Sequence, residues 1–163
     1  MCWRSPRNNS SSGFTLIELV TAVLLIGILS AFAAPRMFDV AALSARGFQD
    51  ETLSFLRYAQ KTAIAQRRVV CLAFTSTSAT LHISAAPGVS TCDTPLRGPA
   101  GDNPGTLMAK GGAAYKVAPT DFNFNGLGQS VDASGAVLSA QTLQVTHVNG
   151  PITVEAVTGY VHE

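Results

Sequence analysis

A long apolar segment near the N-terminus sets the strongest constraint on this chain. From Phe14 to Pro35 nearly every residue is apolar or small. A helix needs about 20 apolar residues to cross a bilayer, and this segment has 22. Arg4 and Arg7 precede the segment and no acid does, so the positive-inside rule keeps the N-terminus in the cytoplasm. The sequence therefore predicts a transmembrane segment over residues 14–35.

One acid, Glu18, interrupts the segment and leaves three interpretations open. Residues 31–33 fit the small-x-small pattern of a signal-peptidase site, which predicts a soluble secreted protein cut after Ala33, although an acid weakens such a signal. A plain membrane anchor leaves Glu18 unexplained, at a cost of about 2.5–3.5 kcal/mol if the charge lies at mid-bilayer. A third interpretation gives the acid a role.

The third interpretation depends on the hexapeptide that begins at Gly13, Gly-Phe-Thr-Leu-Ile-Glu, followed at once by the apolar run. This stretch resembles the class III signal of type IV pilins and type II secretion pseudopilins. The resemblance implies that a prepilin peptidase removes a leader of residues 1–13 by cutting between Gly13 and Phe14. It also implies N-methylation of the new N-terminal Phe14.

The resemblance further implies that Glu18 acts in assembly, by pairing with the terminal amine of a neighbouring subunit. An ammonium and a carboxylate in hydrocarbon are each costly alone and much cheaper as a pair. In similar pilins, a glycine and a proline at the places of Gly27 and Pro35 are points where the helix can loosen. From the residues alone, Pro35 predicts a kink, and Gly27 fits close helix packing equally well.

The helical pattern resumes after Pro35. Phe48, Thr52, Phe55, Ala59 and Ala63 recur at spacings of three and four, which places them on one face of a helix. We therefore expect one long helix from Phe14 to about Gln66. Its second half would belong to a globular domain of residues 36–163, and its apolar face would pack on a sheet.

A basic cluster follows from the same helix, and four residues form it: Arg57, Lys61, Arg67 and Arg68. Three of the four project within about 40° of one another on a helical wheel. Cations near a helix C-terminus favour the helix dipole, so a solvated stripe is the simpler interpretation. A contact with lipid headgroups, a partner or DNA is the alternative.

Beyond residue 68 the pattern changes to the period of two that indicates strands. We expect strands at 69–74 and 80–84, a long irregular loop over 85–112, and a strand at 122–124. The cleanest hairpin signal is Asn149-Gly150 between two alternating runs, and a short strand closes the chain at 160–162. The fold class is therefore α+β, a long N-terminal helix on a C-terminal antiparallel sheet, as in the type IV pilin-like fold.

Three cysteines are present, at Cys2, Cys71 and Cys92. Loss of the leader would remove Cys2 and leave an even pair. In an exported chain an even pair favours a disulfide, so we expect Cys71 and Cys92 to be bonded. Two buried free thiols are the alternative.

Enzyme motifs are missing from the sequence. His82, His147 and His162 have no metal-ligand spacing to one another or to the cysteines, and neither a phosphate-binding loop nor a Gly-x-Ser-x-Gly motif occurs. We therefore expect no enzymatic activity, no catalytic residue, no cofactor and no metal.

The order of elements resembles minor pseudopilins of the GspH/FimT type, and minor pilins of mannose-sensitive haemagglutinin systems are similar as well. The resemblance implies a minor subunit that helps to initiate or cap a type IV pilus or a type II secretion pseudopilus. The implied partners are the prepilin peptidase, other pilin subunits, the inner-membrane assembly platform and the lipid bilayer. The implied location is the bacterial inner membrane, with a periplasmic C-terminal domain, and then the fibre.

Some FimT-like minor pilins bind DNA through a Gly-Arg-x-Arg motif, which makes DNA uptake an alternative function. The corresponding stretch here is residues 159–162, Gly-Tyr-Val-His, and it lacks the arginines. Without the leader, 9 Lys/Arg face 10 Asp/Glu, giving 9 − 10 = −1. Both facts argue against capture of DNA, which needs many phosphate contacts, and only the basic cluster supports it.

Overall fold

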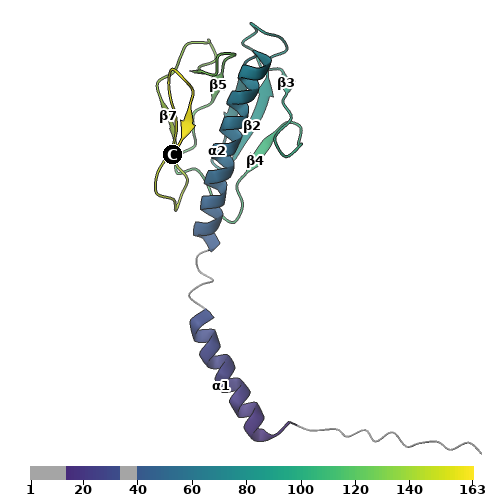
Figure 1. Ribbon diagram of the computed structural model, residues 1–163, viewed down its shortest axis with the longest axis vertical. Helices are drawn as coiled ribbons and strands as arrows, with labels where there is room; N and C mark the ends of the chain where they lie inside the picture. The colour runs from purple at the N-terminus through teal and green to yellow at the C-terminus, as the bar shows by residue number, and fades with distance from the viewer. Residues whose placement is uncertain (1–13, 34–39) are drawn as a thin grey trace, which may run out of the picture. The chain divides into compact units, whose positions relative to one another are not determined.

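The computed structural model describes residues 14–33 and 40–163 of the chain. The chain divides into two units, residues 1–39 and residues 40–163. The first contains helix α1 (Leu16–Ala33), and the second contains helix α2 (Val40–Gln66) and every strand. Figure 1 shows these elements. The predicted domain of 36–163 begins among residues that lie outside the described ones.

Helix α1 begins with a side-chain cap. Thr15 precedes the helix, and its Oγ1 accepts a hydrogen bond from the backbone N–H of Glu18 at 3.3 Å. A threonine followed three residues later by a glutamate is the capping-box spacing, and an acid in the first turn suits the positive end of the helix dipole. The sequence Thr-Leu-Ile-Glu therefore fixes where α1 starts.

The predicted single helix from 14 to about 66 is described as two segments, α1 and α2. Residues 34–39, which include Pro35, lie outside the described residues, so the continuity and the kink stay predictions. Within the part of the chain that the structure describes, no helix combines the length and apolar character needed to cross a membrane. The predicted span of 14–35 extends beyond α1 in both directions.

Helix α2 buries the face that its sequence predicts. Its buried residues are Ala45, Phe48, Gln49, Thr52, Phe55, Leu56, Ala59 and Ala63. This set contains all five predicted positions, because residues three and four apart share one side of a helix. The buried face contacts β1 (Val70–Phe74), β4 (Thr106–Met108), β5 (Phe122–Phe124) and β9 (Val161–His162).

A left-handed residue ends α2. Arg67 has φ 51°, its N–H donates to the carbonyl of Ile64 at 3.3 Å, and the N–H of Arg68 donates to that of Ala63 at 3.2 Å. These two bonds are the pair that closes a Schellman motif, in which glycine usually takes the left-handed place. A Cβ on Gly126 would lie 3.2 Å from the Cα of Arg67, so this glycine lets the turn at 125–129 approach the helix end.

The larger sheet has six antiparallel strands, and α2 leads directly into its centre. The strand order is β3-β2-β1-β5-β6, and β4 pairs with β2 beside the residues that β3 leaves free. The strands are β1 (Val70–Phe74), β2 (Ser78–Ile83), β3 (Thr94–Pro95), β4 (Thr106–Met108), β5 (Phe122–Phe124) and β6 (Ser130–Val131). The predicted strands at 69–74, 80–84 and 122–124 are confirmed.

The predicted irregular loop over 85–112 contains β3 and β4, which the sequence analysis missed. Leu96 donates its N–H to the carbonyl of Leu81 at 3.3 Å, and Gly105 donates its N–H to Leu96 at 2.7 Å. The two loop segments meet closely, since a Cβ on Gly105 would lie 2.6 Å from the Cα of Gly98. Strands of two or three residues are too short to show a period in the sequence.

A smaller sheet of three antiparallel strands completes the second unit. It has the order β7-β8-β9, formed by β7 (Gln141–Leu143), β8 (Ile152–Val154) and β9 (Val161–His162). The predicted strand at the end of the chain is confirmed as β9. The predicted antiparallel pairing of the two last runs is confirmed by β7 and β8. The tight turn predicted at Asn149-Gly150 is wrong, because Leu143 pairs with Ile152 and the connection spans residues 144–151.

The reason for the longer connection is Pro151. A two-residue turn at 149–150 would need the N–H of residue 151 for its closing hydrogen bond, and proline has none. Val145 instead forms an isolated antiparallel bridge with Tyr115, and the N–H of Thr146 donates to the carbonyl of Ala114 at 2.9 Å. The residues after β7 therefore connect the small sheet to the 109–120 segment.

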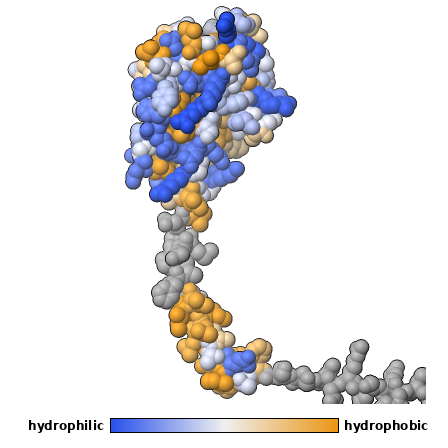
Figure 2. Space-filling model, viewed as in Figure 1, coloured by the Kyte–Doolittle hydropathy of each residue, from blue (hydrophilic) through white to orange (hydrophobic). Residues whose placement is uncertain are grey.

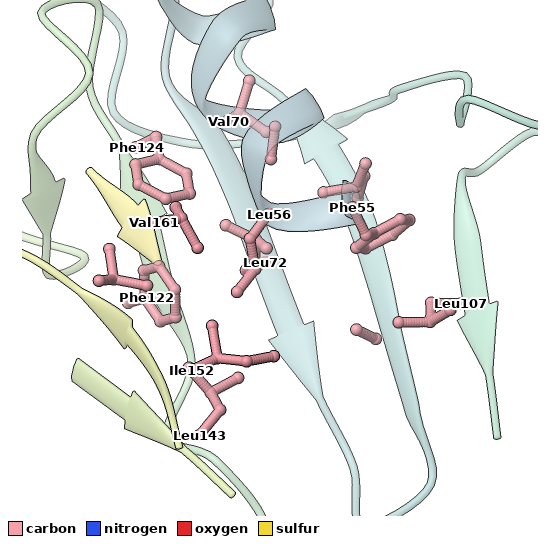
Figure 3. Packing of buried hydrophobic residues seen from close by; sticks show 14 of the residues in the cluster. Phe55, Leu56, Val70, Leu72, Leu107, Phe122, Phe124, Leu143, Ile152 and Val161 are labelled. Carbon is pink, nitrogen blue, oxygen red and sulfur yellow. The ribbon is translucent and has the colours of Figure 1, made fainter. Parts of the chain in front are cut away.

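The hydrophobic core lies between α2 and the two sheets (Figure 3). Leu56 projects from α2 toward Leu72 of β1, while Ile152 and Leu143 approach from the small sheet. Phe122 and Phe124 make an edge-to-face contact with ring centroids 5.5 Å apart. The structure is thus an α+β arrangement of a helix on antiparallel sheet, as the sequence predicts.

Gly128 and Gly159 allow two loops to cross closely beside α2. We therefore expect a side chain added at this crossing to destabilise the domain. Gly159 has φ +61°, and an added Cβ would meet the carbonyl oxygen of Gly128 at 1.8 Å. We expect Gly159→Ala to lower the free energy of unfolding by about 2 kcal/mol or more, because strain and overlap combine.

Urea unfolding of residues 40–163 measures this loss. Gly47→Ala is the matched control, because Gly47 lies in α2 with nothing within 4 Å of an added Cβ. That change should raise the free energy of unfolding by about 0.5–1 kcal/mol. Equal effects of the two substitutions would contradict the tight crossing.

Candidate functional site

The N-terminal segment exposes apolar side chains in every direction. Phe14 is 79% exposed, and from Leu16 to Leu29 the large apolar residues range from 42% for Val20 to 82% for Leu16. Figure 2 shows the same helix as almost uniformly hydrophobic above its first turns. A helix that is apolar all round requires an apolar environment on all sides. Among the described residues of its own unit, α1 has no such cover.

The two hydroxyl groups of α1 form hydrogen bonds within the helix. The hydroxyl of Thr21 donates to the carbonyl of Glu18 at 3.0 Å, and that of Ser30 donates to Ile26 at 2.7 Å. Glu18 lies in the first turn, and nothing approaches within 4 Å of a Cβ built on Gly27. Of the other predicted site residues in this segment, Gly13 and Pro35 lie outside the described residues.

The predicted basic cluster does not form one free cationic surface. Arg57 donates from Nε and Nη2 to the carbonyl of Val161, at 3.1 and 3.0 Å. Arg68 donates from Nε and Nη2 to the carbonyl of Ser84, at 2.5 Å from Nε. Lys61 and Arg67 are exposed. Two of the four cationic side chains are therefore fixed in position by backbone carbonyls at strand ends.

Gln60 has a structural role that the sequence analysis missed. Its Nε2 donates to the carbonyl of Thr158 at 2.9 Å and to that of Gly128 at 3.2 Å. One amide thus joins α2 to both C-terminal loops at the point where Gly128 and Gly159 cross. The only sign of this role in the sequence is that Gln60 is a polar residue one turn after Arg57 on the same helix. Its two partners lie 68 and 98 residues away in sequence, so the sequence could not identify them.

A buried polar pair lies at the centre of the domain. The hydroxyls of Thr52 and Tyr115 are 3.2 Å apart, and Thr52 also donates to the carbonyl of Phe48 at 2.7 Å. Burial raises the pKa of Tyr115 to about 12, and the hydrogen bond with Thr52 opposes this rise. Both hydroxyls are engaged in hydrogen bonds that hold the 109–120 segment on α2. We therefore assign the pair a structural role.

A disulfide joins Cys71 of β1 to Cys92 of the loop that precedes β3. The bond closes a separation of 21 residues, with the two Cα atoms 6.1 Å apart. It attaches the otherwise irregular segment after β2 to the central strand of the larger sheet. The alternative of two buried free thiols does not occur.

Among the residues described, no group of three His, Cys, Asp or Glu side chains could hold a metal ion. The one ion pair in these residues joins Nε2 of His162 to Oε1 of Glu155 at 3.0 Å, and the His162 ring stacks on Tyr160 with centroids 5.4 Å apart. The Glu155 carboxylate, followed by the carbonyl of Glu163, raises the pKa of His162 above its usual value.

Residues 8–34 match the family model for the prokaryotic N-terminal methylation motif. The match contains the Gly13–Phe14 junction, Glu18 and all of α1. This motif is the signal of type IV pilins, and it supports a place for the chain in the type IV pilin superfamily.

A curated relative also supports a place in the type IV pilin superfamily. The chain is 32% identical over 91 residues to the type IV narrow pilus major component PilA5 of Thermus thermophilus. The aligned part is 56% of this chain and 62% of that protein. No solved structure matches the chain.

The disulfide gives the first prediction for this region. Replacing both Cys71 and Cys92 by serine should lower the free energy of unfolding by about 3 kcal/mol, because the loop is then free in the unfolded chain. Chemical denaturation of oxidised wild-type and doubly substituted protein measures the difference. Identical stability of the two proteins would show that the bond does not constrain this domain.

The His162–Glu155 pair gives the second prediction. Because the pKa of His162 is raised, the pair contributes stability while the imidazole is protonated. That contribution is lost as the pH rises through the raised pKa of the folded state. NMR titration of the ring should give a pKa above about 6.5. Glu155→Gln should return this pKa toward its usual value, and an unchanged pKa would contradict the pairing.

Proposed function

We propose that the chain is a structural subunit of a type IV pilus or a type II secretion pseudopilus. The observation that carries the proposal is the coincidence of the methylation motif over residues 8–34 with a helix whose apolar side chains are exposed all round. A fibre core buries such helices against one another, and burial of apolar surface contributes roughly 25 cal/mol per Å². The relative from Thermus thermophilus, a pilus component, supports the same function.

The proposed subunit is first inserted in the bacterial inner membrane. Residues 14–35 would form the anchor, of which the structure describes 14–33. The basic leader residues Arg4 and Arg7 favour a cytoplasmic N-terminus, so the disulfide-bonded domain would face the oxidising periplasm. Extraction by the inner-membrane assembly platform into the fibre would then exchange lipid contacts of α1 for contacts with other subunits.

We also propose the finer role of a minor subunit, which helps to initiate or cap the fibre. This role is supported by the resemblance of the element order to GspH/FimT-type pseudopilins. The curated relative is named a major component, so the copy number decides between the two roles. Quantitative mass spectrometry of purified fibres should give fewer copies of this chain than of the principal subunit, and equal or greater abundance would contradict the minor role.

Processing at the Gly13–Phe14 junction is the first test of the proposed function. Coexpression with a prepilin peptidase should give a mature chain that begins at Phe14 and carries one added methyl group. Without the peptidase, residues 1–13 should remain attached. Intact-mass measurement distinguishes these products, and a cut after Ala33 would instead identify a secreted soluble protein.

Glu18 provides the second test of the proposed function. Substitutions at Glu18 and Thr15 can separate the cap of α1 from the charge of the Glu18 carboxylate. Glu18→Gln keeps a side chain suited to the capping box but removes the charge, whereas Thr15→Ala removes the cap and keeps the charge. We expect Glu18→Gln to reduce incorporation into the fibre at least tenfold, with Thr15→Ala close to wild type. Immunoblots of sheared fibres and membranes measure both. Normal assembly of Glu18→Gln would refute pairing with a neighbouring amine.

A further inference from the structure

The domain contains two Asn-Gly pairs, Asn125-Gly126 and Asn149-Gly150. Asparagine is chemically labile, and the backbone nitrogen of the residue that follows it can attack its side-chain amide. Glycine hinders this attack least, because it has no Cβ and leaves the backbone free to rotate. The sequence therefore offers two equivalent sites for the reaction, but the two turns in which they lie differ.

Hydrogen bonds hold the side chain of Asn125 in place. Its Oδ1 accepts the backbone N–H groups of Leu127 and Gln129, both at 3.0 Å, and its Nδ2 donates to Oε1 of Gln129 at 3.0 Å. The turn is also packed against the end of α2, since a Cβ on Gly126 would lie 3.1 Å from the carbonyl carbon of Arg67. Attack on the Asn125 amide would disrupt these hydrogen bonds and displace the turn.

Asn149 lacks these restraints. Asn149 and Gly150 are both exposed, and among the described residues no hydrogen bond involves either of them. Gly150 has φ +100°, and nothing lies within 4 Å of a Cβ built on it. The pair belongs to the 144–151 connection, outside β7 and β8. Such exposed segments change conformation at little free-energy cost, so the Gly150 nitrogen can reach the Asn149 amide while the sheet stays intact.

The other two described asparagines are poorly placed for the same reaction. The residue after Asn103 is Pro104, and proline has no backbone N–H to lose. Asn123 lies in β5 and is paired with β1 on one side and with β6 on the other, which fixes its backbone. Among the described residues, Asn149 is therefore the asparagine that combines a following glycine with an unrestrained turn.

We propose that Asn149 is a site of spontaneous deamidation and that the fold protects Asn125 from the same reaction. The backbone nitrogen of Gly150 loses its proton to hydroxide and attacks Cγ of Asn149. A bond forms from this nitrogen to Cγ, the Cγ–Nδ2 bond breaks, and the leaving group takes a proton from water and departs as ammonia. Water then opens the cyclic imide at either carbonyl, which gives aspartate or isoaspartate. The reaction needs only water and hydroxide, and the inference does not depend on the proposed function.

Either product carries a carboxylate that Asn149 lacks. Asn149 contributes to two clefts, one lined also by Arg46, Asp50 and Glu163 and the other by Lys116. Within the described part of the chain, neither Arg46 nor Lys116 forms an ion pair, so either cation can pair with the new carboxylate. Asp50 and Glu163 disfavour its approach to the first cleft. The formal net charge of the chain without its leader becomes 9 − 11 = −2, and this surface therefore changes with the age of the protein.

Mass spectrometry of the full chain in detergent tests the site. The protein is incubated at mildly alkaline pH and digested at intervals, and fragmentation of the peptides locates each modified asparagine. Synthetic standards distinguish isoaspartate from aspartate by elution. We expect conversion at Asn149 at least about tenfold faster than at Asn125, because hydrogen bonds must break only at Asn125. Equal rates at the two asparagines would overturn the protection of Asn125.

Free peptides of residues 120–131 and 144–155 give the rates of the same two sites without the fold. We expect both peptides to react, at rates within about threefold of each other. An unmodified Asn149 in the full chain, when its peptide reacts, would overturn the proposed site. The tenfold ratio already present in the free peptides would show that neighbouring residues set the difference, which would overturn the role of the fold.

Gln129→Ala provides the matched variant, because it removes the acceptor of the Asn125 Nδ2 and lies outside the 144–151 connection. In the full chain it should raise the rate at Asn125 at least about twofold and leave the rate at Asn149 unchanged. An unchanged rate at Asn125 would show that this hydrogen bond does not protect it. An equal rise at both asparagines would indicate general loosening of the domain and would also contradict local protection.

Discussion

The packing of one face of α2 against two sheets is the interaction on which the domain depends. Leu56, Ala59 and Ala63 are completely buried there, and the face contacts strands of both sheets. The smaller sheet has three strands of two or three residues each, too short to be stable alone. It exists because Leu143, Ile152 and Val154 complete the core that α2 begins.

Hydrogen bonds from α2 fix the position of the C-terminal strand and of two loops, which contribute little to the apolar core. Arg57 and Gln60, on adjacent turns of α2, bind backbone carbonyls of Val161, Thr158 and Gly128. Each of these bonds satisfies a carbonyl that a short strand or loop leaves unpaired. The disulfide has a similar effect in the larger sheet, where Cys92 attaches the loop before β3 to the central strand β1. Helix α2 thus organises its domain through both its buried stripe and the polar residues beside it.

The two units differ in how much of their apolar surface is exposed to solvent. The domain of residues 40–163 has an apolar core buried within itself, whereas the large apolar side chains of α1 from Leu16 to Leu29 are exposed. Such a helix is stable only among lipids or other apolar helices. The methylation motif over residues 8–34 agrees with this requirement, because it marks chains whose N-terminal helix passes from a membrane into an assembly.

The sequence by itself determined the elements whose signals are local. The apolar run, the Gly-Phe-Thr-Leu-Ile-Glu motif, the buried face of α2, the strand around Cys71 and the pairing of Cys71 with Cys92 all follow from periodicity, motifs and counting. The cap of α1 by Thr15 was equally readable, since the Thr-x-x-Glu spacing is local. Only the tertiary structure decided that Pro151 opens the last hairpin, that β3 and β4 form, and that Arg57 and Arg68 bind carbonyls rather than remain free. These features depend on partners tens of residues away, and a chain's local pattern carries no information about which distant backbone group will lack a hydrogen bond.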